Sequence, residues 1–195
     1  MRRRTYLGSL STAGIAATAG CLDAVPALGD SQTVLSAPER DLSAAAHPSH
    51  GDELPAVSLP DPLSGEEIST EQFAGSRTLL LTFFYTSCPD GMCPALILRL
   101  RRAQAVATEE EFSDEAAFLA MTFDPERDTP SVLREYAAQQ GVNLHTGNWH
   151  FLRPESYERG QEVIDSNFGL QIVKREAEGY EELEYLFPHY NLILL

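Results

Sequence analysis

The chain has 195 residues and a formal net charge of −15 at pH 7, with 29 acidic residues against 14 basic ones. A chain of this length fits one domain of ordinary size with additional segments. The acidic excess argues against nucleic-acid binding, because the sequence offers no basic patch that could neutralise phosphates.

The basic residues are also unusual in type, because Lys174 is the only lysine among them. All 29 acidic residues follow Cys21, whereas only 11 basic residues do, so the chain after Cys21 carries a net charge near −18. Carboxylates keep a protein surface hydrated and soluble in concentrated salt. The composition therefore favours a haloarchaeal source, with an acidic bacterial protein as the alternative.

Residues 1–21 are predicted to be an export signal rather than part of the fold. Paired arginines followed by an aromatic residue and a leucine are typical of a twin-arginine signal. The apolar stretch 7–19 is too short to span a bilayer. It ends in Thr-Ala-Gly before Cys21, which resembles a lipobox. We therefore expect lipidation of Cys21 and a tether on the extracytoplasmic face of the cell membrane; the alternative is an ordinary signal peptide with an incidental cysteine.

Residues 22–55 are predicted to form a flexible spacer. They are rich in Ala, Ser, Pro and Asp and show no sustained apolar period. His47 and His50 lie in this spacer and are expected to be ordinary polar residues rather than a second metal site. From residue 56 to residue 195 the pattern changes to one α/β domain.

The domain is predicted to begin with a short hairpin over residues 57–68. A near-continuous apolar run at 78–85 predicts a strand that is covered on both faces, and 117–123 predicts a second such strand. Further strands are expected at 149–152, 172–173 and 191–195, and helices at 94–108, 130–141 and 154–167. Strands and helices that alternate with short connections indicate a layered α/β fold.

The most informative stretch joins the first buried strand to the first helix and contains Cys88 and Cys93. Because Cys21 is assigned to the anchor, these two cysteines remain, and two thiols so close together do not form a disulfide-stapled scaffold. A dithiol at a strand-to-helix turn suits either thiol–disulfide chemistry or a soft metal ion. A nearby helix N-terminus lowers thiol pKa values, which favours both uses. The residues alone leave the two uses open.

Four motifs occur in the order found in one known family. They are Phe83–Pro94 around the cysteines, Asp124–Pro130, Trp149–Leu152 and the strand entry at His189. Together they resemble the Sco (SenC) family of thioredoxin-fold copper proteins over about residues 55–195. The resemblance implies a thioredoxin-like α/β fold, with a central mixed sheet flanked by helices and an N-terminal hairpin insertion.

The resemblance also implies a function. It indicates a copper metallochaperone that assists assembly of the CuA site in a subunit of cytochrome c oxidase. It implies that Cys88, Cys93 and His189 bind one copper ion, as Cu(I) or Cu(II), and that Asp124 orients a ligand or a partner from beside the site. The donors fit independently, because thiolates suit Cu(I) and imidazole accepts both oxidation states. His150 is expected to be structural.

The spacing of the cysteines departs from the family pattern. Four residues separate Cys88 from Cys93, where the family has three. A bulge beside Gly91 would still bring both sulfurs to one ion, whereas a rotated Cys93 would favour redox work. Met92 is expected to pack rather than to offer its thioether as a further ligand.

The chain also stops at Leu195, six residues after His189, whereas family members continue through a further strand and helix. We expect a truncated sequence. The competing function is a thiol–disulfide oxidoreductase that keeps the oxidase copper-site cysteines reduced; it uses Cys88 and Cys93 and needs no histidine. A peroxiredoxin-like peroxidase is disfavoured because the two thiols form a pair. Metallochaperone work is not catalysis, so any enzymatic activity would be thiol exchange.

Overall fold

The computed structural model describes residues 47–175 and 184–194, so the predicted signal, its Cys21 and most of the spacer lie outside the described residues. The strands are β1 (Ser58–Asp61), β2 (Glu66–Ser69), β3 (Thr78–Phe84), β4 (Ala116–Thr122), β5 (Trp149–Leu152), β6 (Val173–Lys174), β7 (Tyr185–Leu186) and β8 (Asn191–Leu194). The α-helices are α1 (Met92–Glu109), α2 (Pro130–Gln140) and α3 (Tyr157–Phe168), and short 3₁₀ turns are η1 (Thr70–Phe73), η2 (Ser113–Glu115) and η3 (Leu144–Thr146). Over these described ranges, no helix has the length and apolar character needed to cross a membrane.

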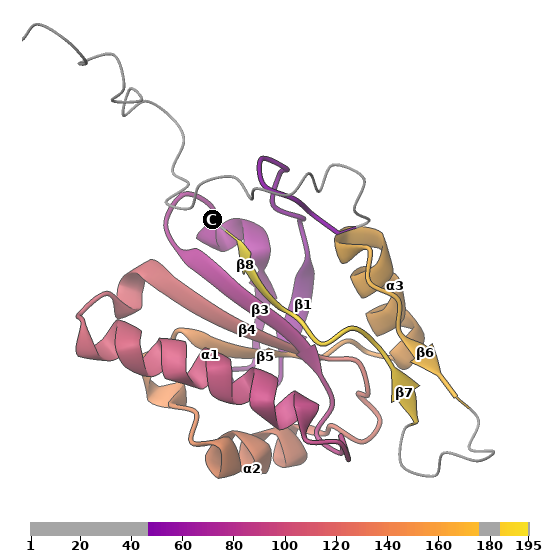
Figure 1. Cartoon of the computed structure of the whole chain (residues 1–195). Coiled ribbons are helices and arrows are strands. Elements are labelled where there is room, and N and C mark those ends of the chain that lie inside the picture. The colour runs from indigo at the N-terminus through magenta and orange to yellow at the C-terminus, as the bar shows by residue number, and fades with distance from the viewer. Residues whose placement is uncertain (1–46, 176–183, 195) are drawn as a thin grey trace, which may run out of the picture. The chain divides into compact units, whose positions relative to one another are not determined.

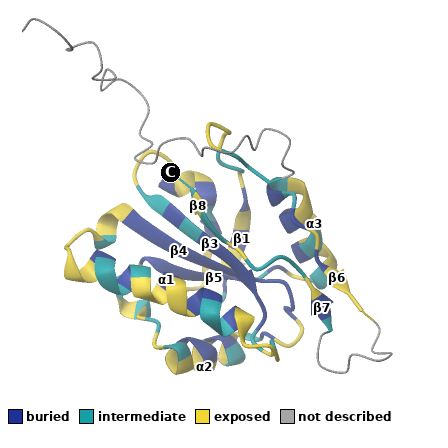
Figure 2. Cartoon of the chain, viewed as in Figure 1, coloured by how far each residue is buried: buried dark blue, intermediate teal, exposed yellow. Residues whose placement is uncertain are grey.

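A four-stranded mixed sheet forms the centre of the domain, in the order β5-β4-β3-β8 (Figure 1). β3 and β4 pair in parallel, as do β4 and β5, whereas β8 runs antiparallel to β3. Every residue of β4 is buried, as expected for a strand covered on both faces (Figure 2). The predicted α/β fold with a central mixed sheet is confirmed.

Helices cover both faces of this sheet. Successive side chains of a strand point to opposite faces, and the last two residues of β3 show which helix lies on which side. Phe83 packs against Phe168 of α3, with ring centroids 5.2 Å apart, whereas Phe84 stacks on Tyr136 of α2 at 5.6 Å. α1 packs against β3, β4 and α2. α3 therefore lies on the face opposite to α1 and α2.

The predicted N-terminal hairpin is formed by β1 and β2 and lies beside β5. Its turn contains Gly65 with φ of 80°, a left-handed conformation that favours glycine. His150 of β5 is buried beneath the hairpin, with its Nδ1 3.2 Å from the Asp61 carboxylate and its ring against Phe73. These contacts agree with the predicted structural role of His150.

Several element boundaries differ from the prediction by a few residues. α1 begins at Met92, two residues before Pro94, because a proline in the first helical turn has no intrahelical N–H bond to lose. α3 begins at Tyr157, because the Ser156 hydroxyl caps the helix by accepting a hydrogen bond from the Arg159 N–H at 3.2 Å. Residues 176–183, between β6 and β7, lie outside the described residues.

Candidate metal centre

Three side chains from distant parts of the sequence meet where β3 joins α1. The sulfur atoms of Cys88 and Cys93 and a ring nitrogen of His189 all lie within 4.8 Å of one another. Both cysteines are free; Cys93 is fully buried and Cys88 is half-buried. The three residues that the resemblance implied as ligands are therefore close enough to share one ion, and their binding of metal stays a prediction.

A tight turn brings the two sulfurs together despite the four-residue spacing. Gly91 adopts a left-handed conformation with φ of 74°, and the Asp90 carboxylate accepts a hydrogen bond from the Met92 N–H at 2.9 Å. The Gly91 carbonyl then accepts the first helical bond, from the Ala95 N–H at 3.2 Å. The extra residue is thus accommodated at Gly91, and of the two alternatives that the sequence left open the structure has the bulge rather than a Cys93 rotated away from Cys88. Met92 is 41 % exposed instead of packed as expected.

Replacing Gly91 with alanine should lower the free energy of unfolding by about 1–2 kcal/mol, because an L-residue is strained in the left-handed region. No atom lies within 4 Å of the position that the new Cβ would take, so the cost comes from the backbone alone. Urea unfolding measures it. Gly147→Ala is the matched control, since Gly147 has φ of 69° and similarly open surroundings. Only Gly91→Ala should also slow formation of the Cys88–Cys93 disulfide; equal oxidation rates would contradict the role of this turn.

The two thiols differ in their electrostatic surroundings. A hydrogen bond from the Cys93 thiol lowers the pKa of Cys88 below its ordinary value, and the Cys93 backbone amide acts in the same direction, while burial and Asp90 oppose them. The same thiol–thiol hydrogen bond, followed by burial, raises the pKa of Cys93 far above its usual range. Cys88 is therefore the more acidic and more accessible sulfur, and Cys93 is the sulfur held inside.

His189 enters the site from the segment between β7 and β8. Burial lowers the pKa of its imidazole, although the Asp90 carboxylate opposes the shift. Its ring packs on Phe187, with centroids 4.1 Å apart, and its Nε2 atom is buried with no hydrogen-bond partner among the described residues. A neutral imidazole with an unpaired ring nitrogen is suited to bind a metal.

The register of β8 fixes the position of His189. Asn191 pairs with Thr82 of β3, and the Thr82 hydroxyl donates to the Tyr190 carbonyl at 2.9 Å. The Asn191 amide donates to the Leu96 carbonyl of α1 at 3.3 Å, so this strand is tied to the helix that carries Cys93. The histidine and the dithiol are thus held by one connected set of strand pairing and side-chain hydrogen bonds.

The carboxylate of Asp128, in the loop before α2, braces the start of the cysteine turn. Asp128 is fully buried and accepts hydrogen bonds from the Thr86 backbone N–H at 3.2 Å and from the hydroxyls of Thr86 and Thr122. Burial raises the pKa of Asp128, and the bonds from both threonines oppose this. A sequence signal for this contact exists: Thr86 and Asp128 follow two parallel strands, whose carboxyl ends meet at one edge of a sheet.

Asp124, which the resemblance placed beside the site, makes different contacts. Its carboxylate lies 2.6 Å from Nε of Arg127, whose guanidinium also donates to Glu184 at 2.6 Å and to the Tyr185 hydroxyl at 3.3 Å. Through these bonds the loop that contains Asp124 holds the segment that leads to His189. A role for Asp124 in orienting a ligand or a partner stays a prediction.

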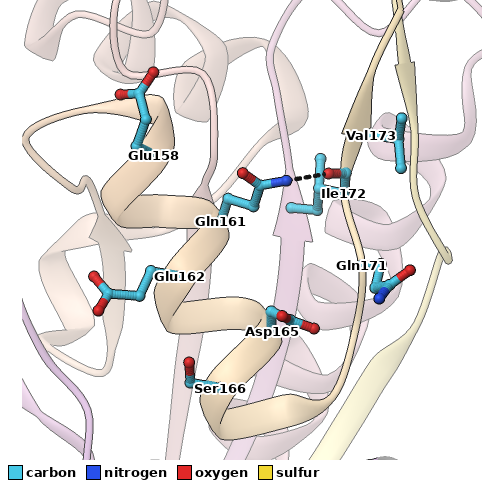
Figure 3. A pocket seen from close by; sticks show the side chains of 8 residues that line it. All are labelled: Glu158, Gln161, Glu162, Asp165, Ser166, Gln171, Ile172 and Val173. Atoms are coloured by element: carbon cyan, nitrogen blue, oxygen red, sulfur yellow. Dashed lines mark hydrogen bonds between the residues drawn. The ribbon is translucent and has the colours of Figure 1, made fainter.

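A second concave region lies apart from the dithiol. A cleft of about 480 Å³ between α3 and the segment that follows it is lined by the eight residues in Figure 3. The Gln161 amide crosses it and donates to the Ile172 carbonyl at 2.7 Å. In the part of the chain that the structure describes, none of the buried unpaired polar atoms belongs to this lining. The dithiol with His189 is therefore the stronger candidate site.

Comparisons with known proteins identify the family of the chain. A family model described as SCO1/SenC matches residues 62–195. An SCO2-like protein of Rickettsia typhi is 27 % identical over 68 % of this chain and 59 % of its own length. The chain thus spans about three-fifths of that curated relative.

Solved structures show the same fold. A SCO1/SenC family lipoprotein from Bacillus anthracis superposes with a TM-score of 0.60 at 20 % identity, covering 73 % of this chain and 77 % of the other. Yeast Sco1 with copper bound gives 0.54 at 19 %, covering 73 % and 74 %. BsSco, described as a member of the Sco family of cytochrome c oxidase assembly proteins with a disulfide switch, gives 0.51 at 21 %, covering 71 % and 83 %. These likenesses confirm the predicted thioredoxin-like Sco fold.

Proposed function

Because the chain belongs to the SCO1/SenC family, we propose that it binds copper as cargo and assists assembly of the CuA site of cytochrome c oxidase. The observation that carries the proposal is the meeting of two sulfurs and a His189 ring nitrogen within 4.8 Å. Two soft thiolates suit Cu(I), and the imidazole adds a ligand that Cu(II) also accepts. A site with only three protein ligands leaves a position through which the metal can pass to an acceptor.

The proposed location follows from the N-terminal sequence. Residues 1–21 act as a twin-arginine signal, Cys21 carries the lipid, and residues 22–55 span the distance from the membrane surface to the domain that begins at residue 56. A tether on the extracytoplasmic face places the metal site on the side where it meets the CuA-bearing subunit, the proposed partner. Mass spectrometry of the mature chain tests this directly, because a lipid on an N-terminal Cys21 has a defined mass.

Metal titration of the reduced mature chain tests the central proposal. We expect one copper ion per chain and, for Cu(II), an intense sulfur-to-copper charge-transfer absorption. Transfer to the metal-free CuA-bearing subunit should follow on mixing, with loss of that absorption. A reduced chain that binds copper with less than one equivalent, or without sulfur-to-copper absorption, would contradict the proposal.

A second candidate function rests on the asymmetry of the two thiols. Cys88 is half-buried with a lowered pKa, whereas Cys93 is fully buried beside it. This is the arrangement of an attacking and a resolving thiol, so the protein could reduce the disulfide of an oxidase copper site by dithiol exchange. In that reaction Cys88 attacks one sulfur of the target disulfide, and Cys93 then displaces the target thiol as the Cys88–Cys93 disulfide forms. Exchange with an oxidised CuA-site peptide, measured with and without copper, separates the two functions.

A further inference from the structure

The segment that carries His189 is held to the rest of the domain by few backbone hydrogen bonds. In the described part of the chain, this histidine segment (residues 184–190) pairs with β6 around the two residues of β7, and pairing with β3 starts only at Asn191. Near the imidazole, the Thr82 hydroxyl ties the segment at the Tyr190 carbonyl. The position of the imidazole therefore depends on the side-chain contacts of the segment.

Aromatic rings connect the histidine segment to the loop that follows β4. The ring of Phe123, just before that loop, lies 5.3 Å from the ring of Tyr185 and 4.7 Å from the ring of Phe187, measured between centroids. Phe187 in turn packs on His189 at 4.1 Å. Such ring pairs hold the segment against the loop, whereas its register along the loop also needs directional bonds.

Arg127 supplies these directional bonds. Its Nε donates to the Asp124 carboxylate at 2.6 Å, and its Nη2 donates to Glu184 at 2.6 Å and to the Tyr185 hydroxyl at 3.3 Å. The Asp124 side chain is only 5 % exposed, so this end of the bridge is fixed within the loop. A planar guanidinium presents its donors in a rigid fork, which suits the joining of two acceptors in a set orientation.

The charges make Arg127 more than one contact among several. Asp124 and Glu184 each accept from a nitrogen of the same guanidinium, so the two carboxylates lie within the screening length of about 8 Å at physiological ionic strength. Among the described residues, Lys174 pairs with Glu184 at 3.6 Å but not with Asp124. Without Arg127, the loop and the histidine segment would present two like charges to each other.

We propose that Arg127 is a positioning residue that clamps the histidine segment to the Asp124 loop, and thereby holds the His189 imidazole at the dithiol and raises the affinity for Cu(II) over Cu(I). The inference rests on the proposed function and deepens it, because it names what makes the third ligand available. Loss of the clamp leaves a site of two sulfurs, which suits Cu(I) but lacks the donor that Cu(II) accepts. Partly exposed ion pairs add little to global stability, so the effect appears in metal preference.

The variant Arg127→Gln tests the clamp through copper binding. Chelator competition should show a Cu(II) affinity that falls about 10-fold, with Cu(I) affinity unchanged and the melting temperature within about 2 °C of the wild type. Arg127→Lys keeps the charge without the fork and should recover part of the loss. Adding Glu184→Gln to Arg127→Gln should also recover part of it, because one of the two facing carboxylates is then neutral.

The matched control is Arg159→Gln. It breaks another arginine–glutamate pair, in which the guanidinium lies 2.8 Å from Glu162 on the exposed face of α3. This variant loses the same charge and one ion pair at a place that has no bond to the histidine segment, so its Cu(II) and Cu(I) affinities should equal those of the wild type.

Nuclear magnetic resonance of the metal-free chain gives a second readout that needs no copper. The His189 ring protons lie against the Phe187 ring and are shifted by its ring current. In Arg127→Gln they should move toward the values of an exposed histidine, such as His145.

Two results would overturn the inference: a Cu(II) affinity that Arg127→Gln leaves unchanged, or equal losses of Cu(II) and Cu(I) affinity, which would mean a general disturbance of the loop. If the wild-type chain bound no copper, the proposed function would fail by itself. The ring-proton shifts would still decide the role of Arg127: a movement in Arg127→Gln supports its positioning of His189, and unmoved shifts refute it.

Discussion

Replacing His189 with alanine is expected to weaken Cu(II) binding by more than about 100-fold, because even the loss of a group that only supports a ligand costs 10- to 100-fold. Cu(I) binding should change much less, since two thiolates remain and Cu(I) prefers soft sulfur donors. Oxidation of Cys88 and Cys93 to a disulfide should continue, because neither sulfur depends on the imidazole for a hydrogen bond. Chelator competition in each oxidation state measures the difference between the Cu(II) and Cu(I) affinities, and the sulfur-to-copper absorption reports on the Cu(II) site.

Two further variants make this test specific. His189→Gln keeps most of the bulk that packs on Phe187 but offers a weaker copper ligand, so it should lose Cu(II) affinity without the packing defect of alanine. His145→Ala removes an exposed histidine of η3 and should change nothing. Unchanged Cu(II) binding in His189→Ala would refute the three-ligand site and leave the thiol–disulfide oxidoreductase as the better account.

The sequence predicted those features of the fold that follow from local physical chemistry. The apolar runs of β3 and β4 are continuous, which is typical of strands buried on both faces. Thr129 and Pro130 are a favourable helix start, and the Thr129 hydroxyl accepts the capping bond from the Val132 N–H. The pair of cysteines was equally visible, because two thiols at a strand-to-helix turn have few uses.

Hydrophobic periodicity in the sequence could not predict the tertiary contacts of the site. His189 lies about a hundred residues from the cysteines, and only the resemblance to a family connected them before the structure did. The buried pair of His150 and Asp61 depends on how the hairpin covers β5, which no local pattern records. The partners of Asp124 and Asp128 could not be distinguished either, since both acids occupy one loop and differ only in the direction that the folded backbone gives them.

Tyr136 is a further case in which the sequence pattern predicts burial but not the contacts of the polar group. It lies on the buried face of α2, and its ring packs on Phe84. Nothing in the helix pattern indicates that its buried hydroxyl lacks a hydrogen-bond partner among the described residues. A helix pattern reports which face of a helix is buried, whereas the polar end of an amphipathic side chain finds its neighbours only in the assembled fold.

Asp128→Ala is expected to lower the free energy of unfolding by about 2–4 kcal/mol, because it leaves three buried or partly buried donors on Thr86 and Thr122 without their acceptor. The same change should weaken copper binding about 10-fold, since Thr86 begins the turn that positions Cys88. Urea unfolding of the metal-free chain and chelator competition on the loaded chain measure the two effects.

Asp128→Asn separates the geometry from the charge in this prediction. The amide keeps the shape and one carbonyl acceptor, and the Thr122 hydroxyl, which already accepts from the Asp124 N–H, also accepts from an amide N–H. Asparagine should therefore recover most of the stability and copper affinity that alanine loses. Asp165→Ala, on the exposed face of α3, controls for the loss of one negative charge and should match the wild type. If asparagine were as damaging as alanine, the charge of Asp128 would matter more than its hydrogen bonds, and the brace described for the cysteine turn would be wrong.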